Sequence, residues 1–599
     1  MPTITPTLGL SRSIVESRQQ LENLQKQLAT GKKVETYGDL GLDRTQILSL
    51  RSELSQIKGY QDSISILNVR LDVMLSSLER FREVASESKS DALEVGFEPL
   101  STGQTIYQTE VASRFDEVAA LLNTEVNGRY LFGGRQVENN PVLPSAEILD
   151  GANGRAGFRQ IAAERRAADL GADGRGRLVL DGPHATVLGG VVATPGDIGG
   201  AAAAQVTIDI GGNAQTFDIS DGGFDTLTAL EAAIDAAFGA DVASIVGGNQ
   251  LQIAATDPTE SITITDVDAG AAALAGLTAG VTTNPTATAS IAEDNATSPF
   301  GFKLAAVTST LSGTNVTGPA GSPSSLDVTF TGTLPNDGES ITVTLDQPDG
   351  TQHELTLTAR SSGPLAAGEF LIGADENETA ANFETALTSS IETAAQQSLS
   401  AASLFEAADN FFDFDEANPP QRVDGPPFDT ATALVDGTTT DTVFWYQGEV
   451  SSTSARQSSV VKVDDSIGVA VGARANEESL TKILKTFAAV AIETFDPDDA
   501  NASKRYNEIK LRANSQLSFR NGAQSPDDII TELTVAKTRA GQASQRHKAS
   551  KALIEDTIGK KENADIYEVS AQILSLQVRI EASLQVSASL SRISILNFI

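Results

Sequence analysis

A seven-residue repeat of apolar side chains over residues 47–78 constrains the fold of this chain more than any other feature of its sequence. The first position of each repeat is occupied by Ile47, Leu54, Gln61, Asn68 and Leu75, and the fourth position by Leu50, Ile57, Ile64, Leu71 and Leu78. Five such repeats predict a long helix, beginning near Asp43 or Thr45, that packs against another helix as in a coiled coil. The apolar members of the repeat are the predicted core of a helical rod. Gln61 and Asn68 either fix the register of that packing or lie on a partly exposed face.

Both ends of the chain carry further helices with apolar stripes. Residues 10–28 form the first, and Gly31 ends it with Lys32 and Lys33 beside its negative C-terminal end. The last helix starts after Asn563 and remains apolar to the end of the chain. A monomer cannot shield all of these side chains against one short helix, so they need a partner. The predicted assembly interface comprises Leu10, Ile14, Leu21, Leu24, Leu28, Ile573, Leu576, Ile580, Leu584, Leu590, Ile593, Leu596 and Phe598.

Shorter helices are expected between these elements. Residues 101–126 are predicted to fold back on the long helix and to end at the Asn127-Gly128 turn signal. Residues 130–134 then read as a short strand followed by a tight bend. In the C-terminal part, a hairpin of residues 460–464 and 468–472 precedes predicted helices over residues 477–492, 503–518 and 527–558.

The middle of the chain carries almost all of its net charge. Residues 178–455 contain three basic and 37 acidic side chains, a formal charge of −34 out of −36 for the whole chain. Such a segment repels nucleic acid and anionic membranes, so no nucleic-acid partner is expected. No stretch approaches the ~20 apolar residues of a membrane span, so no membrane insertion is expected either.

Alternating apolar and polar residues predict β-structure in this acidic middle. Residues 206–210 and 216–219 flank a Gly-Gly-Asn turn and form a plausible hairpin. A helix over residues 226–238 and strands over residues 250–254 and 261–265 should follow.

A second hairpin–helix unit is expected further along the middle. Residues 341–345 and 354–358 form its hairpin, and residues 379–394 form its helix. The two units suggest a duplicated insert, although the spacing of their elements differs. Residues 408–429, rich in phenylalanine and proline, are expected to be an irregular return strand or a linker.

No constellation of catalytic or cofactor-binding residues is visible. The three histidines lie far apart, and no phosphate loop, dinucleotide fingerprint or nucleophile elbow is present. Two acidic clusters, residues 413–416 and 496–499, lack the spacing of a calcium loop and are interpreted as solvated turns. The aromatic run Phe444-Trp445-Tyr446 is interpreted as an anchor of a core rather than a sugar-binding platform. The sequence therefore predicts no enzyme, no cofactor and no metal site.

Four segments near the two ends carry family motifs. They are Gln-Lys-Gln-Leu-Ala-Thr-Gly-Lys-Lys-Val at residues 25–34, Val-Asn-Gly-Arg-Tyr-Leu-Phe-Gly-Gly at 126–134, Trp-Tyr-Gln-Gly at 445–448 with Gly-Ala-Arg-Ala-Asn-Glu-Glu at 472–478, and the ending at 590–599. These segments resemble the bacterial flagellin family, most closely its hook-associated proteins of the hook–filament junction. The loop at residues 37–41 departs from the Pro-Ser-Asp-Asp-Pro loop common in the family, and the insert is large for a junction protein.

The resemblance implies a structural subunit of the bacterial flagellum that self-assembles through its N- and C-terminal helices. It implies identical subunits, a hook-side junction protein, filament flagellin and an export chaperone as partners. It also implies an extracellular location reached through the flagellar type III export apparatus. That route fits a chain with no cysteine and with no basic and then apolar signal peptide at its start.

We predict an α+β multidomain fold in which long, paired, coiled-coil-like helices from both termini enclose β-rich inserted domains. Residues 1–45 with 560–599 form the terminal assembly domain, and residues 46–140 with 443–559 form a helical rod domain with a small β hairpin. Residues 141–320 and 321–442 form two acidic β-rich inserted domains.

Other functions stay open from the sequence alone. A filament-forming flagellin uses the same assembly physics as a junction protein. A secreted adhesin or glycan-binding protein could use the β-rich middle as its working part. An enzyme within the insert is the least supported function, because no catalytic set is visible.

Overall fold

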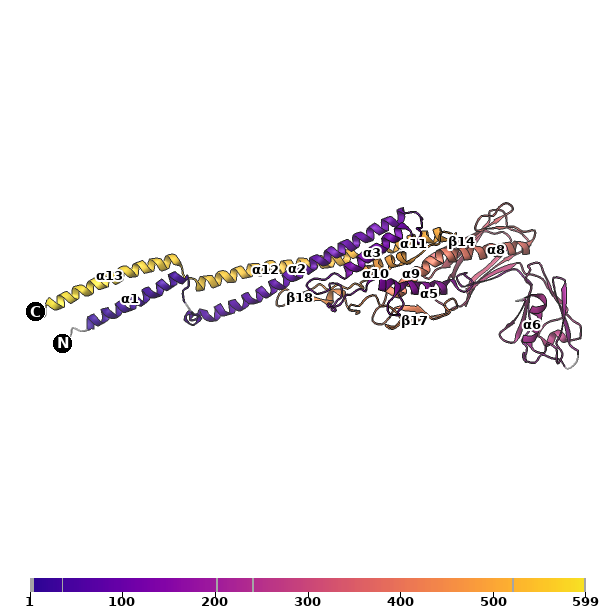
Figure 1. Cartoon of the computed structure of the whole chain (residues 1–599), viewed down its shortest axis with the longest axis horizontal. Coiled ribbons are helices and arrows are strands. Elements are labelled where there is room, and N and C mark those ends of the chain that lie inside the picture. The colour runs from indigo at the N-terminus through magenta and orange to yellow at the C-terminus, as the bar shows by residue number, and fades with distance from the viewer. Residues whose placement is uncertain (1–4, 35, 201–202, 240–241, 520–521, 597–599) are drawn as a thin grey trace.

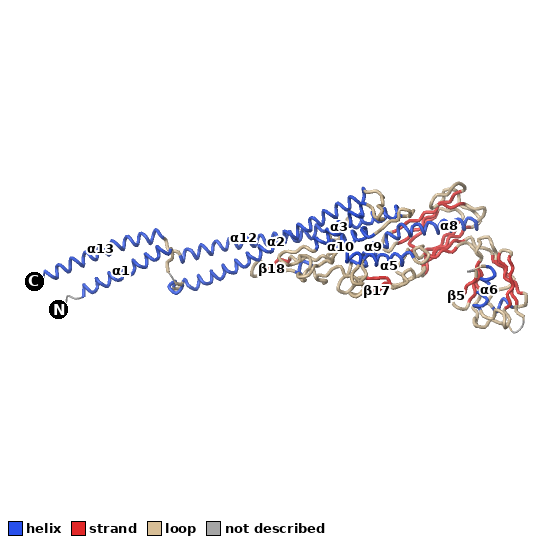
Figure 2. The backbone as a smooth tube through the Cα atoms, in the orientation of Figure 1, coloured by secondary structure: helices blue, strands red, loops and turns tan. Residues whose placement is uncertain are grey.

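The computed structural model describes residues 5–34, 36–200, 203–239, 242–519 and 522–596, except for the side chains of residues 5–11, 37, 39 and 590–596. The molecule is elongated, and its N-terminal and C-terminal helices lie side by side at one end (Figure 1). A helical body occupies the centre, and β-sheets gather at the opposite end around α8 and α6 (Figure 2). The predicted α+β class is confirmed.

Two successive helix pairs form the narrow half of the molecule. α1 (Thr5–Thr30) lies beside α13 (Ile566–Leu596) and runs in the opposite direction. α2 (Asp43–Glu94) lies beside α12 (Pro526–Glu562) in the same way. A single 3-10 turn, Tyr37–Leu40, connects α1 to α2. These bounds agree with the predicted helices because each segment carries the apolar spacing of one helical face.

A short joint connects the two helix pairs through contacts between the two ends of the chain. The Lys33 N–H donates to the Glu562 carbonyl oxygen at 2.8 Å, and the Ala564 N–H donates to that of Gly31 at 2.9 Å. Lys33 Nζ donates to the Lys560 carbonyl oxygen at 2.7 Å, in the last turn of α12. The sequence places Lys33 beside the C-terminal end of its own helix. Its ammonium instead compensates the negative end of α12, because the antiparallel pairing brings that end alongside.

The helical body contains the largest hydrophobic core of the described chain. α10 (Glu478–Ile492) is buried along almost its whole length. It contacts α3 (Ile106–Leu122), α9 (Ser400–Phe412) and α11 (Ala502–Gln516). The smaller elements of the body are α4 (Ser145–Asp150), α5 (Phe158–Leu170), the 3-10 turn Ala455–Ser458, β16 (Gln421–Val423) paired with β17 (Leu434–Asp436), and β18 (Val460–Lys462) paired with β19 (Gly468–Ala470).

The end of α9 differs from the sequence prediction. Residues 408–412, expected to begin a return strand or linker, are helical. The helix runs from α8 (Glu376–Ala394) through a π-helical turn (Ala395–Leu399) directly into α9. The prolines that suggested an irregular segment begin only at Pro419, and Phe411 and Phe412 are buried in the core of the body as helical residues. The hydroxyl groups of the buried Ser400 and Ser403 are hydrogen-bonded. Small polar residues fit between tightly packed helices when their polar atoms are satisfied.

One β-rich module packs on α8, and we call it the α8 module (residues 178–181 with 287–399). Its sheets have the strand orders β1-β9-β12-β11 and β10-β13-β14-β15. The strands are β1 (Leu178–Asp181), β9 (Thr288–Glu293), β10 (Lys303–Ser309), β11 (Thr314–Gly321), β12 (Ser324–Phe330), β13 (Ser340–Asp346), β14 (Gln352–Arg360) and β15 (Glu369–Leu371). Phe383 of α8 contacts Phe330 and Phe370, with ring centroids 5.6 and 5.3 Å apart. These aromatic rings join α8 to the sheets.

The second β-rich module forms the far end of the molecule, and we call it the α6 module (residues 182–286). It contains α6 (Leu227–Phe238), α7 (Ala271–Leu274) and sheets with the strand orders β4-β3-β7-β8 and β2-β6-β5. The strands are β2 (Thr186–Leu188), β3 (Gln205–Ile210), β4 (Asn213–Asp218), β5 (Ala243–Val246), β6 (Gln250–Ala254), β7 (Ile262–Asp266) and β8 (Val281–Thr283). Gly211 and Gly212 turn the β3–β4 hairpin with φ of 60° and 86°, a conformation that glycine adopts without strain.

The hydrophobic clusters favour different domain boundaries from the predicted ones. One cluster joins Leu178 to residues 287–399, and a separate cluster lies within residues 185–277. The division between modules therefore falls near residues 182 and 287 rather than at residue 320. Both predicted hairpin–helix units are present, but their connections differ. α6 leads to β5 in another sheet of its own module, whereas α8 leads back into the helical body.

The carboxylate of Glu339, at the surface of the α8 module, makes the stability of this module sensitive to acid. Hydrogen bonds from Asn336 and from the Ser312 N–H lower the pKa of Glu339 to about 2. The folded state therefore resists protonation of the Glu339 carboxylate. The contribution of this carboxylate to the free energy of unfolding is complete above about pH 4.5 and is lost as the pH falls towards about 2.

Substitution of Glu339 should therefore flatten the acid dependence of stability. Calorimetry of full-length Glu339→Gln is expected to give a smaller fall in the melting temperature of the module between about pH 5 and about pH 2. Glu354→Gln, which removes an exposed carboxylate on β14, is the matched control. Equal acid dependence in Glu339→Gln and the wild type would contradict the role of these hydrogen bonds.

Candidate assembly surface

The terminal helix pair buries one apolar stripe of α13 against α1. Leu24 of α1 forms a cluster with Ile573, Leu576 and Ile580 of α13, and Leu21 packs partly against it. Ile14 is half-buried, whereas Leu28 and Leu584 are exposed. The side chains of Leu10, Leu590, Ile593 and Leu596, and the whole of Phe598, lie outside the described residues. Several residues of the predicted assembly interface therefore pack within the chain.

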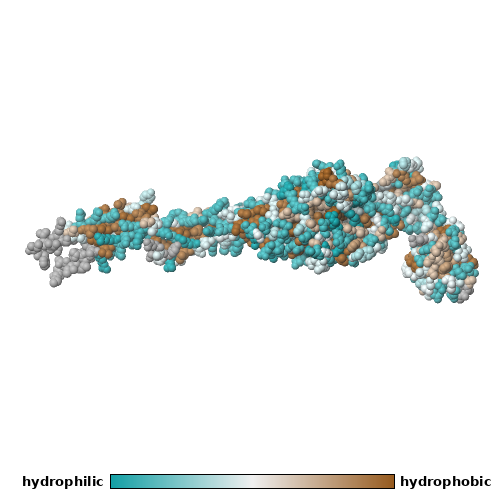
Figure 3. Space-filling model, in the orientation of Figure 1, coloured by the Kyte–Doolittle hydropathy of each residue, from teal (hydrophilic) through white to brown (hydrophobic). Residues whose placement is uncertain are grey.

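A second apolar stripe of α13 lies on the face that α1 does not cover. Tyr567, Leu574 and Val578 are 90%, 64% and 67% exposed. At about 100° per residue, these positions lie roughly opposite the stripe formed by Ile573 and Leu576. Figure 3 shows apolar atoms exposed along the described part of this helix pair. A helix that is apolar on two faces needs cover on both, so this second stripe is the candidate surface for another subunit.

The sequence reasoning missed this second stripe. The spacing of Leu574 and Val578 was visible, since residues four apart share a helix face. The predicted assembly interface instead follows the heptad stripe through Ile573, because that stripe has the same spacing as the repeat of the long helix. Which of two stripes the chain covers by itself depends on a partner helix more than 500 positions away in the sequence.

The long helix α2 presents its repeat to two different environments. Ile47, Ile64, Leu71 and Leu78 are almost fully buried, and Ile57 and Leu75 are buried to a similar degree. Leu50 and Leu54 are partly buried and pack with Ile57 against Ile554 and Ile558 of α12. Gln61 and Asn68 are half-buried. The narrow part of the rod therefore has a thin core, and the second half of α2 shares the large core of the body.

The internal segments that carry the family resemblance meet in the helical body. The Glu449 N–H donates to the Gly133 carbonyl oxygen at 3.0 Å, and the Ala475 N–H donates to that of Phe132 at 2.8 Å. The Tyr446 hydroxyl lies 3.5 Å from the same Phe132 oxygen. Residues 130–134 do not form the strand predicted from local sequence, because Tyr130 and Leu131 bond to nearby residues while residues 132–134 bond to these distant segments. Segments on opposite sides of the insert thus close one structural unit.

Trp445 anchors this unit. Its side chain is fully buried, and its Nε1 donates to the Phe412 carbonyl oxygen at 3.0 Å. Its ring lies 5.8 Å from that of Phe412 and 6.4 Å from that of Phe414. The indole joins the end of α9 to the returning half of the chain, and it is not accessible to a sugar. The interpretation of the aromatic run as a core anchor is confirmed for Trp445.

A buried ion pair and a buried hydrogen bond join the α8 module to the body. Arg512 of α11 lies 2.7 Å from the carboxylate of Asp349, which follows β13. Arg165 of α5 lies 2.8 Å from Asp169, whose other oxygen accepts the Gly301 N–H at 2.9 Å. Removing one member of a buried pair leaves an uncompensated charge, so such pairs favour one arrangement of the two parts.

The acidic clusters noted in the sequence are occupied by protein donors. Asp413 is paired with Lys485, although burial raises the pKa of the Asp413 carboxyl. Asp496 accepts the Asp498 N–H at 2.9 Å, and Asp499 binds Arg505 at the same distance. Within the described ranges, no three histidine, aspartate or glutamate side chains converge as ligands for a metal ion.

The N-terminal part of the chain matches a known protein family. Residues 2–137 match the family model described as the bacterial flagellin N-terminal helical region. The match includes α1, α2, α3 and the turn at Asn127-Gly128. No curated protein matches the chain. No helix in the described part of the chain has an apolar stretch long enough to span a membrane.

Proposed function

We propose that this protein is a structural subunit of the bacterial flagellum that self-assembles through its terminal helices at the hook–filament junction. The observation that carries the proposal is the exposed stripe of Tyr567, Leu574 and Val578 on a helix whose opposite face already packs on α1. Burial of apolar area contributes about 25 cal/mol per Å², so covering this stripe with another subunit favours assembly.

The proposed subunit has three radial layers. The α1–α13 pair lines the inside of a tubular lattice, and the α2–α12 pair with the helical body forms the layer outside it. The α8 and α6 modules project outwards, at the end of the molecule opposite the termini (Figure 1). The acidic insert favours this arrangement, because segments of charge −34 repel one another when crowded. In this arrangement the terminal pairs pack as coiled coils.

The proposed partners follow from the same arrangement. Identical subunits contact one another through the terminal pair, and a hook-side junction protein and filament flagellin occupy the two open ends of the assembly. An export chaperone covers the terminal stripes before assembly, because isolated helices with exposed apolar faces are marginal in water. Export through the flagellar type III apparatus places the subunit outside the cell.

The segments at residues 126–134, 445–448 and 472–478 favour the junction protein over the filament flagellin. They meet in one unit of the body, where Glu449 and Ala475 bind the backbone of Gly133 and Phe132. A filament-forming flagellin is the second candidate, and the size of the insert favours it. An adhesin that uses the β-rich modules is a third, and binding of the full-length protein to a glycan array would favour it.

Assembly of the purified full-length protein tests the proposal. The protein is mixed with isolated hooks, with filament seeds or with neither, and is observed by negative-stain electron microscopy. Short caps or rings that add only to hook ends are expected. Long helical filaments would assign the protein to the flagellins instead, and the absence of any assembly would overturn both functions.

A further inference from the structure

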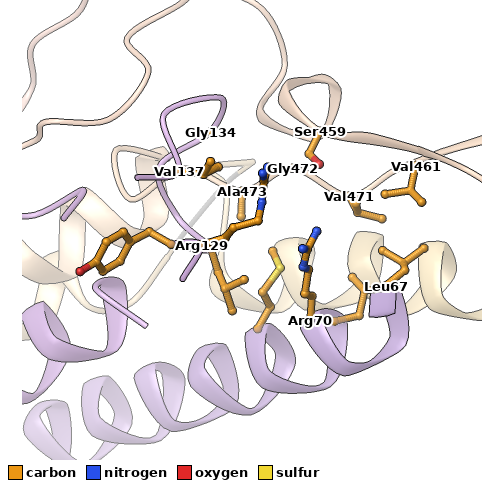
Figure 4. A pocket seen from close by; sticks show the side chains of 14 residues that line it. Leu67, Arg70, Arg129, Gly134, Val137, Ser459, Val461, Val471, Gly472 and Ala473 are labelled. Carbon is orange, nitrogen blue, oxygen red and sulfur yellow. The ribbon is translucent and has the colours of Figure 1, made fainter. Parts of the chain in front are cut away.

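A narrow pocket between α2, the loop after α3 and the β18–β19 hairpin contains two arginine side chains. The pocket has a cavity volume of only about 40 Å³ and is partly open to solvent. Arg70 rises from α2, and Arg129 enters from the loop (Figure 4). Figure 4 shows both guanidinium groups pointing into the same space, below Ser459 and Gly472. No acidic residue lines this space.

Neither guanidinium group has an anionic partner within the part of the chain that the structure describes. Arg70 Nε is buried and has no hydrogen-bond partner. By contrast, Arg80 of α2 and Arg114 of α3 each bind carboxylates of the same chain. Burial and the adjacent charge of Arg129 lower the pKa of Arg70, as expected for two like charges held together. A buried donor without a partner is destabilising unless something else binds it.

The backbone around Arg129 forms a tight turn. Asn127 and Gly128 have φ of 54° and 71°, and the Val126 N–H donates to the Arg129 carbonyl oxygen at 2.9 Å. This two-residue turn is the type that asparagine followed by glycine favours. The turn therefore places the backbone of Arg129 near α2, and the exposed Arg129 side chain extends towards Arg70 (Figure 4).

We propose that Arg70 and Arg129 form an arginine socket that accepts an aspartate or glutamate side chain from a second copy of this chain. Two guanidinium groups can donate several charge-assisted hydrogen bonds to one carboxylate. The inference rests on the proposed assembly function and identifies a polar contact between the helical bodies of neighbouring subunits.

Two observations favour a second copy of the chain as the source of the carboxylate. Outside the acidic middle, residues 178–455, the chain still carries 42 acidic side chains, so the helical parts of a second copy can supply a carboxylate. The socket also lies beside an uncovered apolar surface, since Ile66 and Val69 of α2 are 47% and 51% exposed. Ile66 is four residues before Arg70 and shares its helix face. One neighbouring surface could cover the apolar pair and insert the carboxylate together.

Neutralising either arginine should weaken assembly without lowering the thermal stability of the monomer. Arg129→Gln and Arg70→Gln are expected to keep or raise the melting temperature of the monomer, because they remove the repulsion, and to raise the critical concentration for seeded assembly about tenfold. Arg82→Gln, which removes an exposed arginine from α2, is the matched control and should change the critical concentration by less than about twofold. Wild-type critical concentrations for both socket variants would overturn the proposal.

A second measurement tests the socket without assembly. Sodium acetate should raise the melting temperature of the wild-type monomer relative to sodium chloride at equal ionic strength, and this difference should vanish in Arg129→Gln. An equal response of both proteins to acetate would overturn a carboxylate site. If acetate stabilises the wild type specifically but the socket variants assemble normally, the site takes a free carboxylate and the second-copy assignment is wrong. Failure of the wild type to assemble would overturn the proposed function and the second-copy assignment, and the acetate comparison would still decide whether the socket binds a carboxylate.

Discussion

Deletion of residues 587–599 is expected to abolish polymer formation while leaving the helical body and both β-rich modules folded. The three largest hydrophobic clusters contain no residue beyond Ala543, so the deletion removes nothing from them. It removes the end of α13, which lies beside the beginning of α1. Calorimetry should show unchanged transitions for the body and the modules, and electron microscopy with seeds should show no polymer. Unimpaired assembly of the truncated chain would rule out the terminal layer.

Point substitutions on the exposed stripe sharpen this test. Leu574→Gln combined with Val578→Gln should leave the monomer intact, because both side chains are already exposed. Loss of their burial between subunits, about 1.5–3 kcal/mol for each, should raise the critical concentration by roughly 100-fold or more. Gln572→Ala, on another face of α13, is the control and should assemble like the wild type. Normal assembly of the double variant would show that the stripe is not an interface.

Trp445→Ala is expected to give the largest loss of stability among single substitutions in the helical body. The fully buried indole contacts Phe412 and Phe414 and donates a hydrogen bond to the backbone of α9. Truncation of a buried aromatic side chain typically lowers the free energy of unfolding by about 3–5 kcal/mol. Because the protein has several cores, the effect should appear in the transition of the body and not in that of the α6 module.

Two controls separate the packing of Trp445 from its hydrogen bond. Trp445→Phe keeps most of the apolar area and should lose about 1–3 kcal/mol, mainly from the unpaired carbonyl group. Phe444→Ala removes a neighbouring, partly buried ring and should cost less than Trp445→Ala. The transitions are measured by calorimetry, since Trp445 is the only tryptophan and its fluorescence is lost in the variant. A loss below about 1 kcal/mol in Trp445→Ala would contradict its role as the anchor.

Elements with strong local signals could be predicted from the sequence. The hairpin of β3 and β4 follows from alternation around a glycine pair, and α2 follows from its heptad repeat. Elements that depend on distant segments could not be predicted in this way. Residues 132–134 bind residues more than 300 positions away, and the small polar residues at the start of α9 are buried between helices that come from distant parts of the chain.

The candidate assembly surface shows the same limit. The sequence identifies the apolar side chains of the terminal helices but not which face is covered within the chain. Ile573 and Leu576 fit the heptad pattern, and α1 buries them. Leu574 and Val578 lie off that pattern and stay exposed. The proximity of Arg70 to Arg129 could not be predicted from the sequence either, because the fold brings these residues together across 58 intervening positions.

The pairing of β1 with β9 brings together the two points at which the α6 module joins the rest of the chain, so this module can be replaced as a unit. Asp181, where the chain leaves β1 for this module, lies opposite Ser290 of β9, where the chain has returned. Two attachment points so close together can be bridged by a short turn or by an unrelated domain without moving the strands that carry them. The outermost part of the protein can therefore change in size or be replaced without altering β1 and β9, while the terminal helices stay under the constraints of the proposed assembly.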